Sequence, residues 1–220
     1  MEILKYGEID YIIRYPESFS DGNKYPLVIY LHGAGGRGRD VKRLTEHSFF
    51  VDSAPYLTEA VSVIPQCYAD SWFNIFEQLQ DYVTTMIALP FVDPDRVYLI
   101  GASMGGYGTW QLAMSRPELF AAIAPICGGG MYWNTARLKN TPVWAFHGDS
   151  DCTVLPEESR KMVDGVNKNG GNARLTLYEN TSHNAWSPTF QNPEVWKWLL
   201  SQKNHYTQTR TEFNDTKTYG

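Results

Sequence analysis

Cysteine, positive charge and long hydrophobic runs are all scarce in this sequence, and each scarcity excludes a class of protein. The chain of 220 residues has three cysteines, which are odd in number and show no C-x-x-C spacing. This count argues against a disulfide framework and is typical of buried thiols in a reducing compartment. The net charge of −5 predicts no basic surface, so nucleic acid and anionic membranes are not expected as partners.

Membrane and cofactor signals are also missing. The apolar runs are only as long as strands, and the first residues, M-E-I-L-K-Y-G-E, lack a basic segment followed by an apolar one. We therefore expect no membrane span and no export signal, which favours a cytoplasmic protein. There is no H-E-x-x-H motif and no clustered Cys/His spacing, so we expect no metal ion and no cofactor.

The residues that are present predict one globular α/β domain over residues 1–200. A content of 43% hydrophobic and 14% aromatic residues is enough for one substantial core. From residue 25 onward, strand, loop and helix patterns alternate, which predicts a mainly parallel sheet with helices on both faces. Residues 201–220 are polar and are expected to form a C-terminal tail.

The expected elements follow from periodicity and from turn residues. The predicted strands cover residues 8–15, 25–31, 60–65, 97–100, 120–126, 142–146 and 173–178. The predicted helices cover residues 40–50, 74–89, 107–115, 156–169 and 193–200. The segment between the strands at 120–126 and 142–146 is too short for a sizeable cap domain, so an open, shallow site is expected.

The most informative stretch is residues 97–107, V-Y-L-I-G-A-S-M-G-G-Y. A bare G-x-S-x-G is a weak pattern, because glycine and serine are common residues. Here the pattern lies where a predicted strand meets a predicted helix, as a nucleophile elbow requires, and the glycines give the tight turn its room. We interpret Ser103 as a catalytic nucleophile.

A serine hydroxyl needs a base that takes its proton. Of the five histidines, His183 alone lies in a loop directly after a late predicted strand, so we interpret it as the base. His32 and His147 each precede a glycine at a strand end and are expected to brace loops by hydrogen bonds. His47 and His205 are expected at the surface.

The base in turn needs an acid that orients it, and two aspartates follow the strand that ends at Phe146. Asp151 is the preferred acid, and Asp149 is expected to cap or brace the turn. The resulting order along the chain, Ser then Asp then His, is that of α/β-hydrolases. A cysteine nucleophile is disfavoured, because no cysteine has the elbow sequence.

The glycine-rich run of residues 32–38, H-G-A-G-G-R-G, follows a predicted buried strand. Such a loop lets backbone N–H groups approach a ligand closely. It could cradle a phosphate, but it lacks both the G-x-G-x-x-G that opens a helix and the Lys-Ser/Thr ending. An oxyanion-binding loop is the favoured interpretation.

Four aromatic residues are candidate contacts for a substrate ring. Trp72 lies in the loop after the strand at 60–65, where it could pack in the core or form a wall of the substrate pocket. Tyr107, Trp133 and Trp186 could also offer stacking surfaces. We take Trp72, Tyr107 and Trp186 as substrate-binding candidates.

Taken together, the motifs Y-P-L-V-I-Y-L-H-G-A-G-G-R-G, D-P-D-R-V-Y-L-I-G-A-S-M-G-G, W-A-F-H-G-D-S-D-C-T-V and S-H-N-A-W resemble the α/β-hydrolase superfamily. More narrowly, the chain is similar to the compact phospholipase/carboxylesterase and polyhydroxybutyrate-depolymerase-like esterases, a group often labelled predicted peptidase. The resemblance implies Asp151 as the acid and the N–H groups of Met104 and Ala34 as the oxyanion hole. Dienelactone hydrolases share the fold but use cysteine at the elbow, so Ser103 argues against that branch.

The resemblance implies a serine carboxylic ester hydrolase that acts on a small-molecule ester with a short or aromatic acyl group, including acyl groups on carbohydrate. A thioesterase, a lysophospholipase or a small serine peptidase would use the same chemistry on another bond. A noncatalytic binding protein on this fold is disfavoured, because such chains commonly lose a member of the triad and all three candidates are present.

Overall fold

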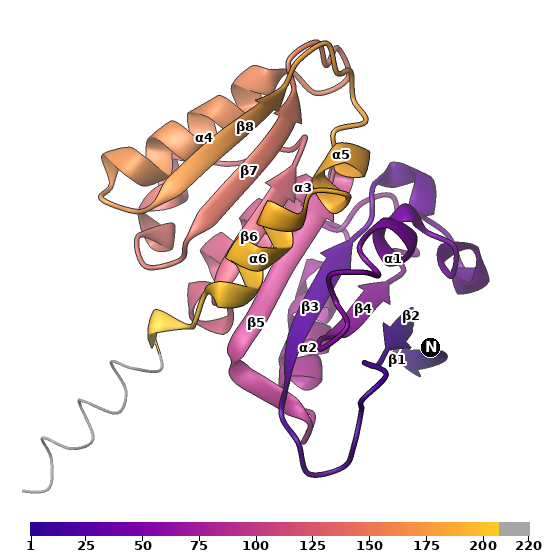
Figure 1. Ribbon diagram of the computed structural model, residues 1–220. Helices are drawn as coiled ribbons and strands as arrows, with labels where there is room; N and C mark the ends of the chain where they lie inside the picture. Colours follow the sequence, from indigo (N-terminus) through magenta and orange to yellow (C-terminus); the bar gives the residue numbers. More distant parts are fainter. Residues whose placement is uncertain (207–220) are drawn as a thin grey trace, which may run out of the picture.

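The computed structural model describes residues 1–206 and contains one mixed β-sheet (Figure 1). The described strands are β1 (Glu2–Tyr6), β2 (Ile9–Arg14), β3 (Tyr25–Leu31), β4 (Val61–Pro65), β5 (Val92–Ala102), β6 (Ala122–Ile126), β7 (Val143–Gly148) and β8 (Ala173–Tyr178). The α-helices are α1 (Ser48–Asp52), α2 (Phe76–Ile87), α3 (Met104–Ser115), α4 (Pro156–Lys168), α5 (Trp186–Phe190) and α6 (Pro193–Ser201). Short 3₁₀ helices are η1 (Ala34–Gly36), η2 (Val41–Leu44), η3 (Pro117–Leu119) and η4 (Tyr132–Leu138).

The sheet order is β1-β2-β4-β3-β5-β6-β7-β8. The first two pairings, β1 with β2 and β2 with β4, are antiparallel, and the pairings from β4 through β8 are parallel. The parallel strands are buried along their length in β3, β4, β6 and β7, as expected when helices cover both faces. The predicted mainly parallel sheet is confirmed.

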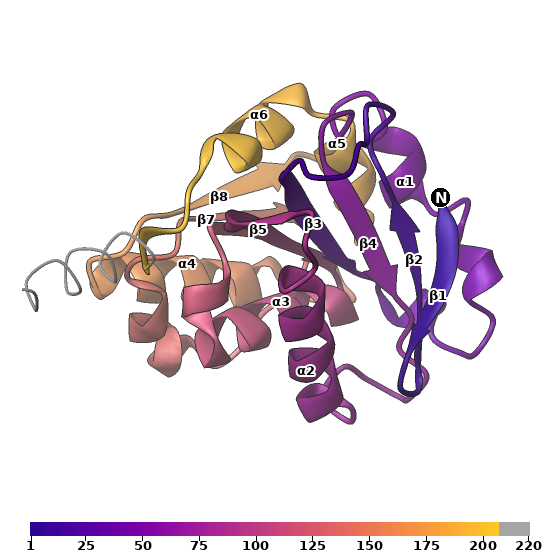
Figure 2. The same ribbon diagram turned by 90° about the horizontal axis from the view of Figure 1, so that it is seen from below.

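Two layers of helices cover the sheet, and each layer closes its own hydrophobic core. Helices α2, α3 and α4 lie on one face, and α1, α5 and α6 lie on the other (Figure 2). The first core is built on buried side chains such as Tyr82, Trp110 and Met162. The second includes Phe49 and Trp196. Because both faces are covered, polar chemistry is left to the sheet edge at which the parallel strands end.

The strand order changes direction at β3, which lies between β4 and β5. In open α/β sheets such a switch point leaves a crevice at the carboxyl ends of the strands. Here the loop after β3 and the turn after β5 flank that crevice, and the loops after β7 and β8 end at the same edge. The fold therefore brings the glycine-rich loop, the elbow and the candidate acid and base to one place.

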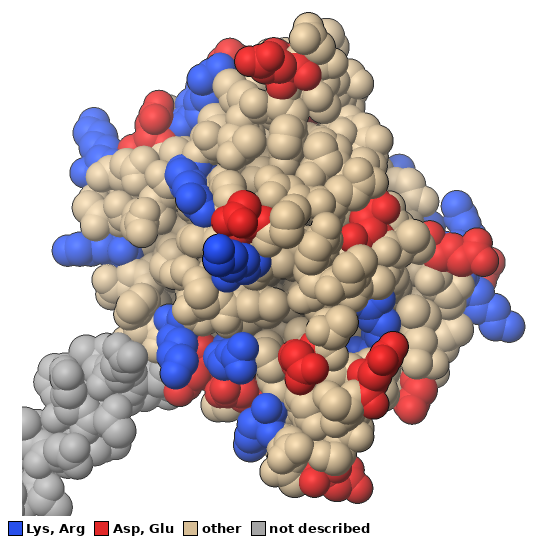
Figure 3. All heavy atoms as spheres, viewed as in Figure 1, with Lys and Arg blue, Asp and Glu red and all other residues tan. Residues whose placement is uncertain are grey.

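On the face shown in Figure 3, basic and acidic side chains are interspersed. None of the helices within residues 1–206 has the length and apolarity to span a membrane. Part of the segment that was predicted as a tail packs on the body of the protein, because Asn204 donates hydrogen bonds to the carbonyl oxygens of Asp95 and Glu118. Residues 207–220 of that predicted tail lie outside the described part of the chain.

Candidate active site

The turn at Ser103 has the strained geometry of a nucleophile elbow. Ser103 lies between the end of β5 and the first residue of α3, with φ of 55° and ψ of −119°. Positive φ is uncommon for a residue other than glycine and is found mainly where surrounding structure enforces it. The amide of Ser103 is fixed by donating to the carbonyl of Ile126 at 2.9 Å. The strain lifts the hydroxyl out of the sheet.

The close packing around the elbow requires glycine at position 105. A Cβ atom on Gly105 would lie 1.8 Å from the carbonyl oxygen of Leu31. That oxygen belongs to the neighbouring strand β3, so it cannot move aside as a flexible side chain could. Gly105 therefore lets α3 start directly against the sheet.

Three side chains from separate segments meet at the elbow. His183 Nε2 lies 2.8 Å from Ser103 Oγ, and His183 Nδ1 lies 2.7 Å from Asp151 Oδ2. A carboxylate only accepts hydrogen bonds, so Nδ1 carries a proton and donates a hydrogen bond to Asp151. Nε2 is left to accept a hydrogen bond from the serine hydroxyl. This is the arrangement of hydroxyl, imidazole and carboxylate that nucleophilic catalysis needs.

Asp151 is held in a single orientation by hydrogen bonds to both of its oxygens. Oδ1 accepts from the amides of Thr153 at 2.8 Å and Val154 at 3.0 Å, and Oδ2 accepts from His183. Burial alone would raise the pKa of Asp151, but the hydrogen bonds from His183 and the two amides outweigh it, so the pKa is lowered. The acid therefore stays ionised beside the base.

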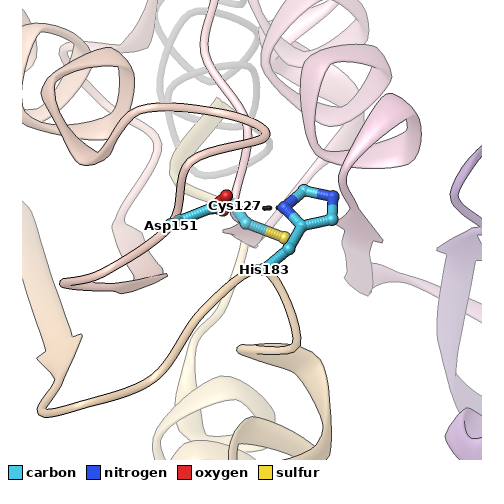
Figure 4. Close-up of side chains that lie close together, drawn as sticks. All are labelled: Cys127, Asp151 and His183. Atoms are coloured by element: carbon cyan, nitrogen blue, oxygen red, sulfur yellow. Dashed lines mark hydrogen bonds and ion pairs between the residues drawn. The ribbon is translucent and has the colours of Figure 1, made fainter.

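A thiol lies beside the acid and the base (Figure 4). Cys127, directly after β6, has a φ of 39°, and its sulfur lies within 4.8 Å of a carboxylate oxygen of Asp151 and of a ring nitrogen of His183. Burial raises the pKa of this thiol to about 12, so it stays protonated, and Asp151 and His183 already bind each other. We therefore interpret Cys127 as a neutral packing neighbour of the pair, and not as a nucleophile or metal ligand.

The glycine-rich loop lies against the elbow, and the loop and the elbow each present one unpaired amide. A Cβ atom on Gly33 would lie 3.4 Å from Cβ of Ser103. Ala34 is the first residue of η1 and Met104 is the first residue of α3. The first amides of a helix have no acceptor within that helix. Both N–H groups that were assigned to the oxyanion hole are therefore available at the elbow.

His32 and Trp72 support this loop from behind. The His32 ring donates from Nδ1 to the Gly33 carbonyl at 2.7 Å, and its Nε2 accepts from the amide of Cys67 at 3.0 Å. Burial lowers the pKa of His32 to about 4, so the ring is neutral. The indole Nε1 of Trp72 donates to the His32 carbonyl at 3.0 Å.

A cavity of about 480 Å³ opens next to Ser103. Residues 33–36 of the glycine-rich loop line it, and of the other lining residues outside the triad only Trp186 was predicted from the sequence as a binding residue. The lining outside the loop and the triad comprises Tyr30, Arg43, Leu44, His47, Ala102, Thr153 and Trp186. For Arg43, Leu44 and His47 the sequence held a signal, because they lie only a few residues after the glycine-rich loop of residues 32–38.

Two of the three substrate-binding candidates do not line this cavity. Trp72 is fully buried, so of its two interpretations the core one is right and the assignment as a substrate contact is wrong. Tyr107 is half-buried on α3 and lies outside the lining. Trp186 does line the cavity, and its ring meets that of His183 edge-on at 5.5 Å between centroids. Trp133 is 71% exposed on η4 and lies outside the lining.

The remaining histidines and Asp149 have structural contacts. His47, which was expected at the surface, is half-buried: it caps α1 by accepting from the amide of Phe49, and it lines the cavity. The expectation that it is a surface residue is therefore wrong. Asp149 is exposed and accepts from the Ser150 hydroxyl at 2.8 Å. His147 is fully buried at the end of β7.

Comparisons with known proteins give a family and several relatives. The model of the dienelactone hydrolase family matches residues 58–195. A solved thermostable esterase has 33% sequence identity to this chain and a TM-score of 0.81, and the alignment covers 92% of this chain and 62% of that one.

Two curated relatives differ in the bond that their names imply. Dipeptidyl-peptidase 5 of Porphyromonas gingivalis is 21% identical over 90% of this chain and 34% of that protein. Feruloyl esterase D of Neurospora crassa is 23% identical over 73% of this chain and 59% of that protein. The chain thus spans about a third of the peptidase and less than two thirds of the esterase.

Proposed function

Because the chain belongs to the dienelactone hydrolase family, we propose that it is a serine ester hydrolase that cleaves short or aromatic acyl esters through an acyl-enzyme. The observation that carries this proposal is the pair of hydrogen bonds that joins Ser103 to His183 and His183 to Asp151. The elbow strain and the unpaired amides beside it support the same chemistry. The three cysteines are free thiols, which fits the cytoplasmic location that the sequence suggested.

The serine at the elbow does not exclude membership of this family. From the sequence, Ser103 was expected to argue against the dienelactone hydrolases. The family match runs from residue 58 to residue 195 and includes Ser103. The expectation was therefore wrong: a serine at the elbow is compatible with membership of this family.

In the proposed mechanism, Ser103 Oγ attacks the acyl carbonyl while His183 Nε2 takes the hydroxyl proton. Asp151 keeps the imidazole in the productive tautomer and stabilises it once it is protonated. The amides of Ala34 and Met104 donate to the oxyanion, and each such donor typically contributes about 3 kcal/mol. His183 then protonates the leaving alcohol, and the same groups activate the water that releases the acid.

The cavity supports an acyl group of moderate size. Its volume of about 480 Å³ is in the range of small-ligand pockets, and its lining includes the rings of Tyr30, His47 and Trp186. Aromatic walls of this kind stabilise an apolar or aromatic group and leave orientation to a few polar atoms. The relationship to a feruloyl esterase fits an aromatic acyl group, and acyl groups on carbohydrate belong to the same class.

Replacing Trp186 by alanine is expected to lower selectivity for aromatic acyl groups. Loss of one ring contact, worth about 0.5–1.5 kcal/mol, corresponds to roughly a tenfold decrease at most in the ratio of kcat/KM for a feruloyl ester to that for an acetyl ester. Trp133→Ala is the matched control, because Trp133 is exposed outside the cavity. An unchanged ratio in Trp186→Ala would remove Trp186 from the acyl site.

A peptidase is the second candidate, and the relationship to dipeptidyl-peptidase 5 favours it. We expect a panel of acetyl, butyryl, octanoyl and feruloyl esters to be hydrolysed faster than aminoacyl amides, thioesters or lysophospholipids. A fluorophosphonate probe should label Ser103 in the same preparation. Faster turnover of the amides would reject the esterase in favour of the peptidase, and absence of labelling would favour a noncatalytic protein.

A further inference from the structure

The Asp151 carboxylate is approached by two histidines. His183 Nδ1 lies 2.7 Å from Oδ2, and His147 Nε2 lies 3.2 Å from the same oxygen. The side chains of Asp151 and His147 have no solvent exposure. The mechanism above assigns no role to His147, although its ring is in contact with the acid.

The partners of the His147 ring determine where its protons lie. Nε2 is 2.8 Å from the carbonyl oxygen of Val154, which can only accept, so Nε2 carries a proton. Nδ1 is 2.8 Å from Ser159 Oγ, and Ser159 Oγ donates to the carbonyl of Gly128 at 2.9 Å. A hydroxyl has one proton to donate. All three bonds can form together only if Nδ1 is protonated as well, that is, if the ring is an imidazolium.

A positive charge on His147 also balances the charge of the site. An ionised carboxylate that is removed from water is costly unless it is paired and hydrogen-bonded. In the resting arrangement His183 is neutral, because its Nε2 accepts from the Ser103 hydroxyl. Without a charged His147, Asp151 would be a buried anion with only neutral donors around it.

Other titratable groups near this pair do not supply that charge. Cys127, from the end of β6, and Tyr107, from α3, both have a pKa raised first of all by burial, so both are neutral. Glu158, from α4, is a third neighbour of this region, and its carboxylate lies 3.6 Å from the ammonium of Lys161. His147 is thus the cationic partner that remains within reach of Asp151.

We propose that His147 is a positioning residue that, as an imidazolium, forms an ion pair with the Asp151 carboxylate, so that this carboxylate is shared between His147 and His183. This inference rests on the proposed roles of Ser103, His183 and Asp151. A carboxylate that is shared with a second cation stabilises a proton on His183 less strongly. The base therefore remains unprotonated, and the enzyme active, at lower pH than it would beside an unshared aspartate.

The first test compares pH–rate profiles for p-nitrophenyl acetate in the wild type and in His147→Gln. Glutamine keeps N–H donors at this position but removes the charge. We expect the acid limb of kcat/KM to move to higher pH by about one unit, which is the size of effect that a nearby charge typically produces. The same acid limb as in the wild type, in a folded variant, would overturn the proposal.

The matched control is His32→Gln. His32 is also a buried histidine before a glycine at a strand end, and it too braces a loop, but its ring is neutral and faces Gly33 and Cys67. Its replacement is expected to lower the rate without moving the acid limb. If the acid limb of kcat/KM moves equally in both variants, the shift is a general effect of loop disorder, and this result would contradict the proposed role of His147.

A second measurement does not depend on activity or on the folding of a variant. Nitrogen-15 NMR of the histidine rings in the wild-type protein distinguishes a ring with two N–H protons from a ring with one. We expect two on His147 and one on His32 at neutral pH. A single proton on His147 would overturn the proposal, and that result is separate from any failure of the esterase assignment.

Discussion

Ser103→Ala is expected to lower the rate of p-nitrophenyl acetate hydrolysis by about 10⁴- to 10⁶-fold and to leave the fold intact. Removal of the nucleophile of a Ser-His-Asp site costs an effect of this size, because the acyl-enzyme can no longer form. The side chain is small and points out of the sheet, so its loss should not change the core. Steady-state kinetics together with circular dichroism measure both parts of the prediction.

Ser182→Ala is a suitable control for this variant. Ser182 is exposed and directly precedes the base in the chain, so it shares the local environment of the site but not the role of Ser103. It should retain wild-type kinetics. Substantial hydrolysis by a folded Ser103→Ala protein would reject Ser103 as the nucleophile, whatever the control shows.

Gly105→Ala is expected to destabilise the whole protein. The new methyl group would lie 1.8 Å from the carbonyl oxygen of Leu31 and 2.8 Å from that of His32. Both acceptors belong to the backbone at the end of β3, so relief of the clash needs helix α3 to move away from the sheet. We expect a loss of more than about 4 kcal/mol of unfolding free energy, and a melting temperature that falls by roughly 10 °C or more.

Gly35→Ala separates this steric effect from a general effect of replacing glycine. Gly35 belongs to the oxyanion loop, and a Cβ atom there would have no neighbour within 4 Å. Its melting temperature should stay near that of the wild type. Thermal denaturation of both variants makes the comparison, and a stable Gly105→Ala protein would contradict the close packing at the elbow.

The parallel core was predictable because its strands are continuous apolar runs between turn residues. The segments predicted at 25–31 and 173–178 are the bounds of β3 and β8. Amphipathic helices were also recovered to within two or three residues, since the pattern of a helix with one buried face is local. These elements need no information from distant parts of the chain.

Strand β1 was missed because its sequence carries no burial pattern. Its residues are exposed, apart from the half-buried Tyr6. The strand forms because Gly7, with φ of 55°, permits a tight turn into β2, whose residues pair with it. Pairing with a neighbouring strand is a tertiary effect, so the pattern of apolar and polar residues within the five residues of β1 does not reveal it.

Two boundaries were wrong for physical reasons that lie outside the local pattern. The elbow strand was predicted over residues 97–100, but β5 extends from Val92 to Ala102 and includes Pro94, with an irregular register opposite Tyr25 and Leu27. An irregularity of this kind tolerates a proline within a strand. The helix predicted over residues 40–50 is divided into η2 and α1.

The candidate triad was visible in the sequence because each member follows a strand, and parallel strands end at one edge. The cavity was not visible, because its walls depend on how residues 41–47 fold back over the loop after β3. Trp72 could not be assigned for the same reason, because its loop position fits both interpretations. It is buried, and its indole donates a hydrogen bond to the His32 carbonyl, a tertiary contact that the local sequence does not reveal.

The candidate catalytic residues and the cavity lining come from different segments, which has a consequence for how this protein can change. The candidate catalytic residues Ser103, Asp151 and His183 follow strands β5, β7 and β8. Three residues that line the cavity, Arg43, Leu44 and His47, come from the connection between β3 and β4. Substitutions in that connection can reshape the acyl cavity and leave the reacting groups in place. A library confined to residues 41–47 is therefore the economical route to new substrate preferences on an unaltered catalytic framework.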